Sequence, residues 1–128
     1  MKIEVSNGEI LDKITILVIK SKKILDPVKL KNINVELDEL VSFLDVVNYE
    51  TNMTVNSLVK ELEKINEKLW DVEDKLRDKE RSRQFDDEFI QLARSVYFTN
   101  DERARIKKLL NEVTNSKFVE EKSYQKYD

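Results

Sequence analysis

One stretch, from Thr54 to Gln84, constrains the fold of this chain more than any other. Apolar residues recur there at alternating spacings of three and four: Val55, Leu58, Leu62, Ile65, Leu69, Val72 and Leu76. This is the a/d spacing of coiled coils, and almost every residue between these positions is polar or charged. A helix of this length spans about 45 Å, and its single apolar stripe has to be covered by other helices. The sequence therefore predicts an all-α protein, an antiparallel helical bundle around a long central helix.

Start and stop signals divide the rest of the chain into about five helices. Two capping boxes, Ser6-x-x-Glu9 and Thr99-x-x-Glu102, each mark a helix start. Asp26-Pro27 separates the first helix from the second, because aspartate caps a helix and proline fits its first turn. The predicted helices cover 10–25, 27–47, 54–84, 87–98 and 100–113. The β-branched run 14–19 also fits a strand, but the apolar pattern around it continues for longer than a strand does.

The length and the residue usage predict a single domain over residues 1–128. The chain has one glycine and one proline, too few for a turn-rich β protein. Residues 1–5 alternate weakly and are expected to form an extended arm. Residues 115–128 show no clear period and are expected to be a loosely structured tail.

The composition excludes several kinds of chemistry. Without cysteine or histidine there is no thiol nucleophile, no imidazole base and no ordinary zinc site. No cofactor or metal is predicted, and any metal would have to be a hard cation held by carboxylates. The apolar runs are too short for a membrane span or a signal peptide, so we expect a cytoplasmic protein. A net charge of −3 argues against nucleic acid as the main partner.

The arginines are the first candidate for a binding site. All six lie between positions 77 and 105, and a guanidinium group binds carboxylates and phosphates through paired hydrogen bonds. The candidate anion-binding residues are Arg77, Arg81, Arg94, Arg103 and Arg105. The alternative is that each arginine pairs with a nearby acid on its own helix. Trp70 and Tyr97 are candidates for an aromatic platform beside the arginines, although large aromatics more often cover the edge of a core.

Carboxylates occur at spacings that suit a metal ion on neighbouring helices: Glu36, Glu39, Glu67, Asp71 and Asp74. In spacing and helical class they resemble the Mg²⁺ site of all-α nucleotide pyrophosphohydrolases. A helix as acidic as these produces such spacings by chance, so a solvated acidic face explains them more simply.

Four segments carry a resemblance that covers almost the whole chain: VSNGEILDKITIL (5–17), NEKLWDVEDKLRDKE (66–80), EFIQLARSVYFTNDERARIKKLLN (88–111) and EEKSYQKY (120–127). They resemble an uncharacterised domain-of-unknown-function family of small helical proteins from bacteria, many of them marine, and their phages. The resemblance implies a stand-alone domain and carries no activity with it.

The sequence favours a non-enzymatic accessory or protein-interaction module that self-associates. The alternative is an enzyme that binds a small anion, a nucleotide or a sugar phosphate through the arginines, with Mg²⁺ on carboxylates. Self-association is expected through the first helix, where Ile16 and Ile19 lie off the main apolar face. Such a surplus of apolar surface is typical of a homodimer interface.

Overall fold

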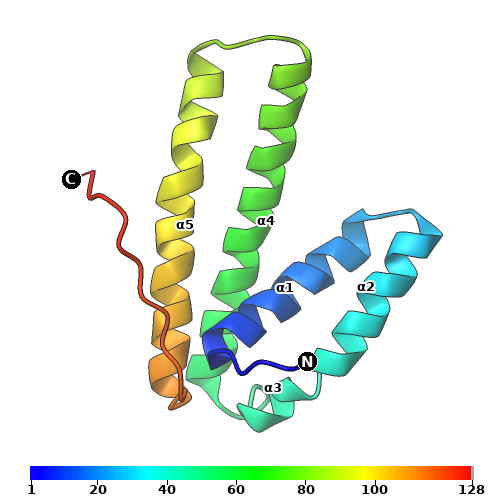
Figure 1. Ribbon diagram of the computed structural model, residues 1–128, viewed down its shortest axis with the longest axis vertical. Helices are drawn as coiled ribbons and strands as arrows, with labels where there is room; N and C mark the ends of the chain where they lie inside the picture. Colours follow the sequence, from blue (N-terminus) through cyan, green and yellow to red (C-terminus); the bar gives the residue numbers. More distant parts are fainter. Residues whose placement is uncertain (128) are drawn as a thin grey trace.

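A computed structural model describes residues 1–127 and contains only helices, with no strand in that range. The helices are α1 (Asn7–Lys23), α2 (Pro27–Leu40), α3 (Phe43–Val46), α4 (Met53–Arg81) and α5 (Asp87–Val113). Four of them are long, and α3 is a single turn between α2 and α4 (Figure 1). The all-α fold class is confirmed, and so is helical structure at 14–19.

The longest elements, α4 and α5, form an antiparallel hairpin that runs the full height of the molecule (Figure 1). The long helix predicted within 54–84 is confirmed as one unbroken element, because α4 extends from Met53 to Arg81. Helix α1 lies across the lower part of this hairpin and contacts both of its helices, while α2 packs against α1. The upper part of the hairpin therefore projects beyond the other helices.

The hydrophobic core lies where α1 meets the lower half of the hairpin. Its buried members are Leu11, Val47, Val55, Val59, Leu62, Ile106 and Leu110. Val59 is not an a/d position, and its burial shows that α4 uses a second stripe toward α1. Asn66 also lies outside the a/d positions and bonds Asp12 and Thr15 of α1, so residues off the a/d stripe help α4 to support α1 as well as α5.

Two predicted helix boundaries are wrong. The chain does not break between residues 98 and 100, because α5 is continuous from Asp87 to Val113 and Thr99 is buried inside it. No glycine or proline interrupts that segment, so the capping-box pattern at Thr99 lacks the break that it would need. The predicted helix 27–47 in turn ends at Leu40, and the chain then turns into α3.

The apolar surplus predicted for α1 is also partly wrong. Ile19 is only 2% exposed and is covered by the chain's own helices, while Ile16 is partly buried. The reason is that α1 is covered on several sides, by α2, α4 and α5. Ile19 therefore offers no surface to a second copy, and the homodimer through this pair loses its main support. Self-association of the chain itself stays a prediction.

The helix starts follow the predicted chemistry. Ser6 Oγ accepts a hydrogen bond from the Glu9 N–H at 3.2 Å, and Asp26 caps the turn that contains Pro27. Asn52 caps α4. Asp86 caps α5 by accepting from the Phe89 N–H at 2.9 Å. Each cap satisfies backbone donors that the first turn of a helix leaves unpaired.

The cap at Asp86 predicts how stability depends on pH. Its pKa is lowered, first because the carboxylate accepts the Phe89 N–H and then because Lys79 donates to it. A carboxyl group with a lowered folded pKa stabilises the fold above its unfolded pKa, about 3.9, and that contribution disappears as the pH falls through the folded pKa. With no histidine in the chain, the melting temperature should be nearly constant from pH 6 to 8 and should fall in acid.

Thermal melts of the wild type and an Asp86→Asn variant from pH 8 to pH 2 test this. Asparagine also caps helices but has no carboxylate to protonate, so the variant should lose less stability than the wild type below pH about 4. Parallel curves in acid, or a transition between pH 6 and 8, would show that other groups govern the pH dependence.

The N-terminal arm contacts the beginning of the C-terminal tail near the foot of α5. Residues 1–5 form no helix, and the tail from 117 to 127 runs back along α5 without regular structure (Figure 1). Lys117 bonds Glu4 at 3.2 Å, and Ser6 donates to Glu120 at 3.1 Å. The predicted tail included residue 128, which lies outside the described residues.

None of the helices in residues 1–127 has the length and apolar character needed to cross a membrane, and a cytoplasmic location stays a prediction.

Candidate functional site

A cluster of polar side chains is buried where α1 and α4 cross. Asp12 and Thr15 of α1 are 1% and 2% exposed, and Asn66 of α4 is 5% exposed. The Asn66 amide nitrogen donates to Asp12 Oδ1 and to Thr15 Oγ1, at 2.9 Å each. Thr15 in turn donates to the Asp12 carbonyl oxygen at 2.7 Å. These bonds fix the position of Asn66 relative to α1.

Arg103 reaches the same carboxylate from α5. Its Nε donates to Asp12 Oδ1 at 2.9 Å, and its Nη2 donates to Asp12 Oδ2. The hydrogen bond to Asp12 raises the pKa of Arg103 above its usual range. Across residues 1–127 every buried side-chain nitrogen or oxygen has a hydrogen-bond partner. The buried charge is therefore balanced, and Asp12 ties three helices together at one point.

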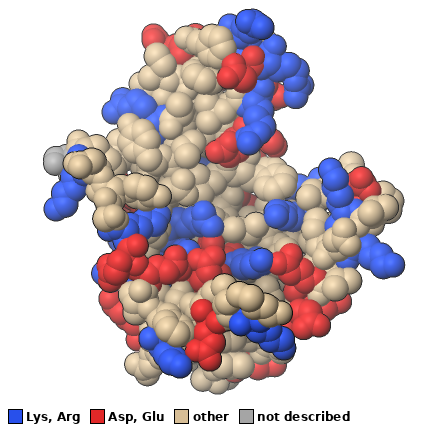
Figure 2. All heavy atoms as spheres, in the orientation of Figure 1, with Lys and Arg blue, Asp and Glu red and all other residues tan. Residues whose placement is uncertain are grey.

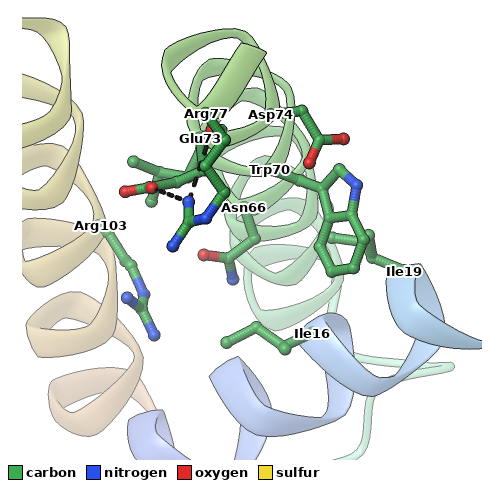
Figure 3. A pocket seen from close by; sticks show the side chains of 9 residues that line it. Ile16, Ile19, Asn66, Trp70, Glu73, Asp74, Arg77 and Arg103 are labelled. Carbon is green, nitrogen blue, oxygen red and sulfur yellow. Dashed lines mark hydrogen bonds and ion pairs between the residues drawn. The ribbon is translucent and has the colours of Figure 1, made fainter. Parts of the chain in front are cut away.

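A pocket of about 430 Å³ opens beside this cluster, in the wedge between α1 and α4. We call it the wedge pocket (Figure 3). Its lining residues are Ile16, Ile19, Asn66, Leu69, Trp70, Glu73, Asp74, Arg77 and Arg103. The isoleucines, the leucine and the half-buried indole supply apolar walls. The buried Asn66 and the partly buried Arg103 supply polar groups at depth, and the other charged residues are more exposed.

The charges around the wedge pocket are balanced. Two arginines and two carboxylates line it, and Asp12 lies behind it. The Arg77 guanidinium bonds the Glu73 carboxylate one turn away, as Arg103 bonds Asp12. Figure 2 shows basic side chains gathered over the upper end of α4, with acidic and basic side chains intermixed over the lower half of the molecule. The pocket is therefore close to neutral rather than cationic.

The five candidate arginines do not gather around one space. Arg77 and Arg103 line the wedge pocket, whereas Arg81, Arg94 and Arg105 lie elsewhere. Arg81 lies 3.9 Å from Asp78, and Arg105 lies 3.0 Å from Glu102. The Arg94 guanidinium lies over the Phe98 ring, 5.8 Å from its centroid. The alternative interpretation, in which each arginine pairs with a nearby acid on its own helix, therefore holds for three of the five arginines: Arg77, Arg81 and Arg105.

The two candidate aromatics also occupy different places. Trp70 lines the wedge pocket, and Tyr97 lines a second pocket of about 710 Å³ between α5 and the tail, which we call the tail pocket. Tyr97 packs there against Phe98 and Tyr127, with ring centroids 4.8 and 5.5 Å away. Arg103 lines both pockets and is the group that they share.

The carboxylates at metal-like spacing do not converge on one point. Glu36 pairs with Lys13 at 2.5 Å and Asp71 with Lys23 at 3.7 Å. Within residues 1–127 no three acidic side chains gather in an arrangement that could hold a metal ion. The pairing with lysines fits the solvated acidic face that was the simpler explanation.

Three members of the buried cluster, Asp12, Thr15 and Asn66, were not predicted from the sequence. A signal was present in α4, where Val59, Asn66 and Trp70 share one face at helical spacing. Val59 and Trp70 are the apolar residues outside the a/d positions, so a polar residue between them on that face is expected to be covered. Asp12 carried no such signal, because its partner Arg103 lies 91 positions away.

Comparison with known proteins gives a family and no individual relative. No curated protein and no solved structure matches the chain. The sequence profile of a family of unknown function, DUF6165, matches residues 1–127. The chain therefore belongs to this family, and the resemblance to an uncharacterised family is confirmed.

Proposed function

We propose that this member of the DUF6165 family is a non-enzymatic protein-interaction module that receives a side chain of a partner protein in the wedge pocket. The observation that carries the proposal is the pocket itself, which combines apolar walls, balanced charges and deep polar groups held by bonds between helices. Apolar walls suit the aliphatic part of an inserted side chain, and polar groups in fixed positions select the functional group at its end.

The charge balance favours this role over the alternative of an anion-binding enzyme. A phosphate or nucleotide would need free cationic donors, but Arg103 gives two hydrogen bonds to Asp12 and Arg77 bonds Glu73. Freeing Arg103 would leave the Asp12 carboxylate buried without its counter-charge, which is strongly unfavourable. The arginines therefore support the fold and the shape of the pocket more than they support binding of a polyanion.

Photo-crosslinking tests the proposal. A benzophenone amino acid is placed at Asp74, which is exposed and lines the wedge pocket, and in a matched control at Glu39, which is exposed on α2. After irradiation in the host cell, the position-74 protein should give an adduct with a second polypeptide, and the position-39 protein should not. A third protein combines the position-74 crosslinker with Ile16→Phe, which fills the pocket and should abolish the adduct.

Mass spectrometry of the crosslinked adduct identifies the partner. An adduct of two copies of this chain would make the predicted homodimer the partner. An absent adduct at position 74, or one that persists in the Ile16→Phe protein, would contradict the proposed role of the pocket.

A further inference from the structure

The side-chain oxygen of Asn66, which lines the wedge pocket, has no protein partner within residues 1–127. Asp12 accepts hydrogen bonds and cannot donate them when ionised, so the Asn66 amide must present its nitrogen to Asp12. That nitrogen uses both of its hydrogens, on Asp12 and on Thr15. The orientation leaves Asn66 Oδ1 pointing away from α1, and Figure 3 shows it on the side of the pocket where Arg77 and Arg103 lie.

Asn66 Oδ1 must be accessible from the wedge pocket. In the described residues no fully buried side-chain oxygen lacks a partner, and no bond to Asn66 Oδ1 is formed within the chain. Asn66 is 95% covered and lines the wedge pocket. Its remaining accessible surface therefore belongs to that pocket, where a strong acceptor is held in one orientation.

A second polar residue that lines the wedge pocket, Arg103, has an unused donor. Arg103 uses Nε and Nη2 on Asp12, and its Nη1 has no partner within residues 1–127. The Asn66 nitrogen and Arg103 Nε both donate to the same oxygen, Asp12 Oδ1, at 2.9 Å. The two side chains are therefore neighbours, and together they offer one acceptor and one donor to a bound group.

We infer that the wedge pocket recognises a neutral planar group that carries a carbonyl and an N–H on the same edge, namely the side-chain carboxamide of a partner's glutamine or asparagine. Arg103 Nη1 donates to its carbonyl, Asn66 Oδ1 accepts its N–H, and Trp70 with Ile16 packs against its stem. The inference rests on the proposed function, because it specifies which side chain the partner inserts.

Other common groups fit this pair less well. A carboxylate has only acceptors and would face Asn66 Oδ1, and an ammonium or guanidinium group has only donors and would face Arg103. A backbone peptide bond is trans, so its carbonyl and its N–H point in opposite directions and cannot make both bonds at once. A cyclic lactam has the required edge, so it is the other source of the same chemistry.

The full-length protein is titrated with small probes, and the resonances of the Asn66 side-chain amide and the Trp70 indole are followed by NMR. The carboxamide probe is N-acetyl-glutamine methylamide, and the lactam probe is uracil. The controls are the N,N-dimethyl carboxamide analogue, which lacks the side-chain N–H, and N-acetyl-glutamate methylamide. A buried acceptor left unpaired weakens binding roughly tenfold or more, so both controls should bind at least about tenfold more weakly than the carboxamide probe.

The comparison uses the wild-type protein, so it does not depend on a variant that fails to fold. Equal binding of the carboxamide and its two controls, or no shift of either resonance with any probe, would overturn the inference. If a crosslinked partner is found while the probes show no preference, the inference falls and the proposed function stands. Binding of uracil alone would contradict a partner's glutamine or asparagine as the source.

Discussion

Asp12→Ala should lower the free energy of unfolding by about 3–5 kcal/mol, the usual cost of removing one partner of a buried ion pair. The substitution removes the acceptor for both Arg103 and Asn66 at the point where α1, α4 and α5 meet. It also removes a carboxylate that is 1% exposed, so water does not readily replace it. Urea denaturation followed by circular dichroism at pH 7 measures the loss.

Two further variants separate the buried pair from ordinary surface charge. Arg103→Met should cost a similar amount, because it leaves the Asp12 carboxylate buried and unneutralised. Arg105→Ala removes an arginine that is paired with Glu102 at the surface and should cost about 0–1 kcal/mol. A loss below 1 kcal/mol for Asp12→Ala would mean that the cluster is open to water and contributes little to the fold.

Gly8→Ala should destabilise the protein by about 1–3 kcal/mol, as inserting a methyl group into a close-packed contact usually does. A Cβ at this position would lie 2.5 Å from the Lys107 carbonyl oxygen and 2.9 Å from Asn111 Oδ1. The Gly8 N–H also donates to that Asn111 oxygen at 2.7 Å, so α1 and α5 would have to separate and stretch this bond. Thermal melts of the two proteins measure the effect.

The sign of this result is informative, because alanine normally stabilises a helix by about 1 kcal/mol relative to glycine. Glu39→Ala, on the exposed face of α2, serves as a control for the general effect of an added alanine. A Gly8→Ala protein as stable as the wild type would show that the contact between α1 and Lys107 can widen without cost.

The sequence predicted the parts of the fold that local patterns determine. The a/d spacing identified α4 over its full length, and Ser6, Asp26 and Asn52 mark helix starts because their side chains bond nearby backbone N–H groups. The same local logic produced the error at Thr99. A capping box describes a helix start only if the preceding helix has ended, and nothing in the sequence of α5 ends it.

The sequence identified some residues of the candidate site but did not predict which of them come together. Trp70, Arg77 and Arg103 were identified and do line one pocket, but Arg81, Arg94, Arg105 and Tyr97 do not. Periodicity shows which face of a helix is apolar, and it carries no information on which distant helix covers that face. The contact between Asp12 and Arg103 joins residues 91 positions apart, so only the tertiary structure could reveal it.

That separation has a consequence for how the chain is made. Helix α1 leaves the ribosome before α4 and α5, yet two groups that hold it, Arg103 and Asn111, are synthesised 91 and 103 positions after their partners Asp12 and Gly8. The α4–α5 hairpin relies on contacts between neighbouring segments and can form as soon as both helices are available. Until then Leu11 and Ile19 stay exposed on the nascent chain, and transiently exposed apolar surface is what favours aggregation. The growing chain should therefore need a chaperone most until α5 has been synthesised, and docking of α1 should be the late step of folding.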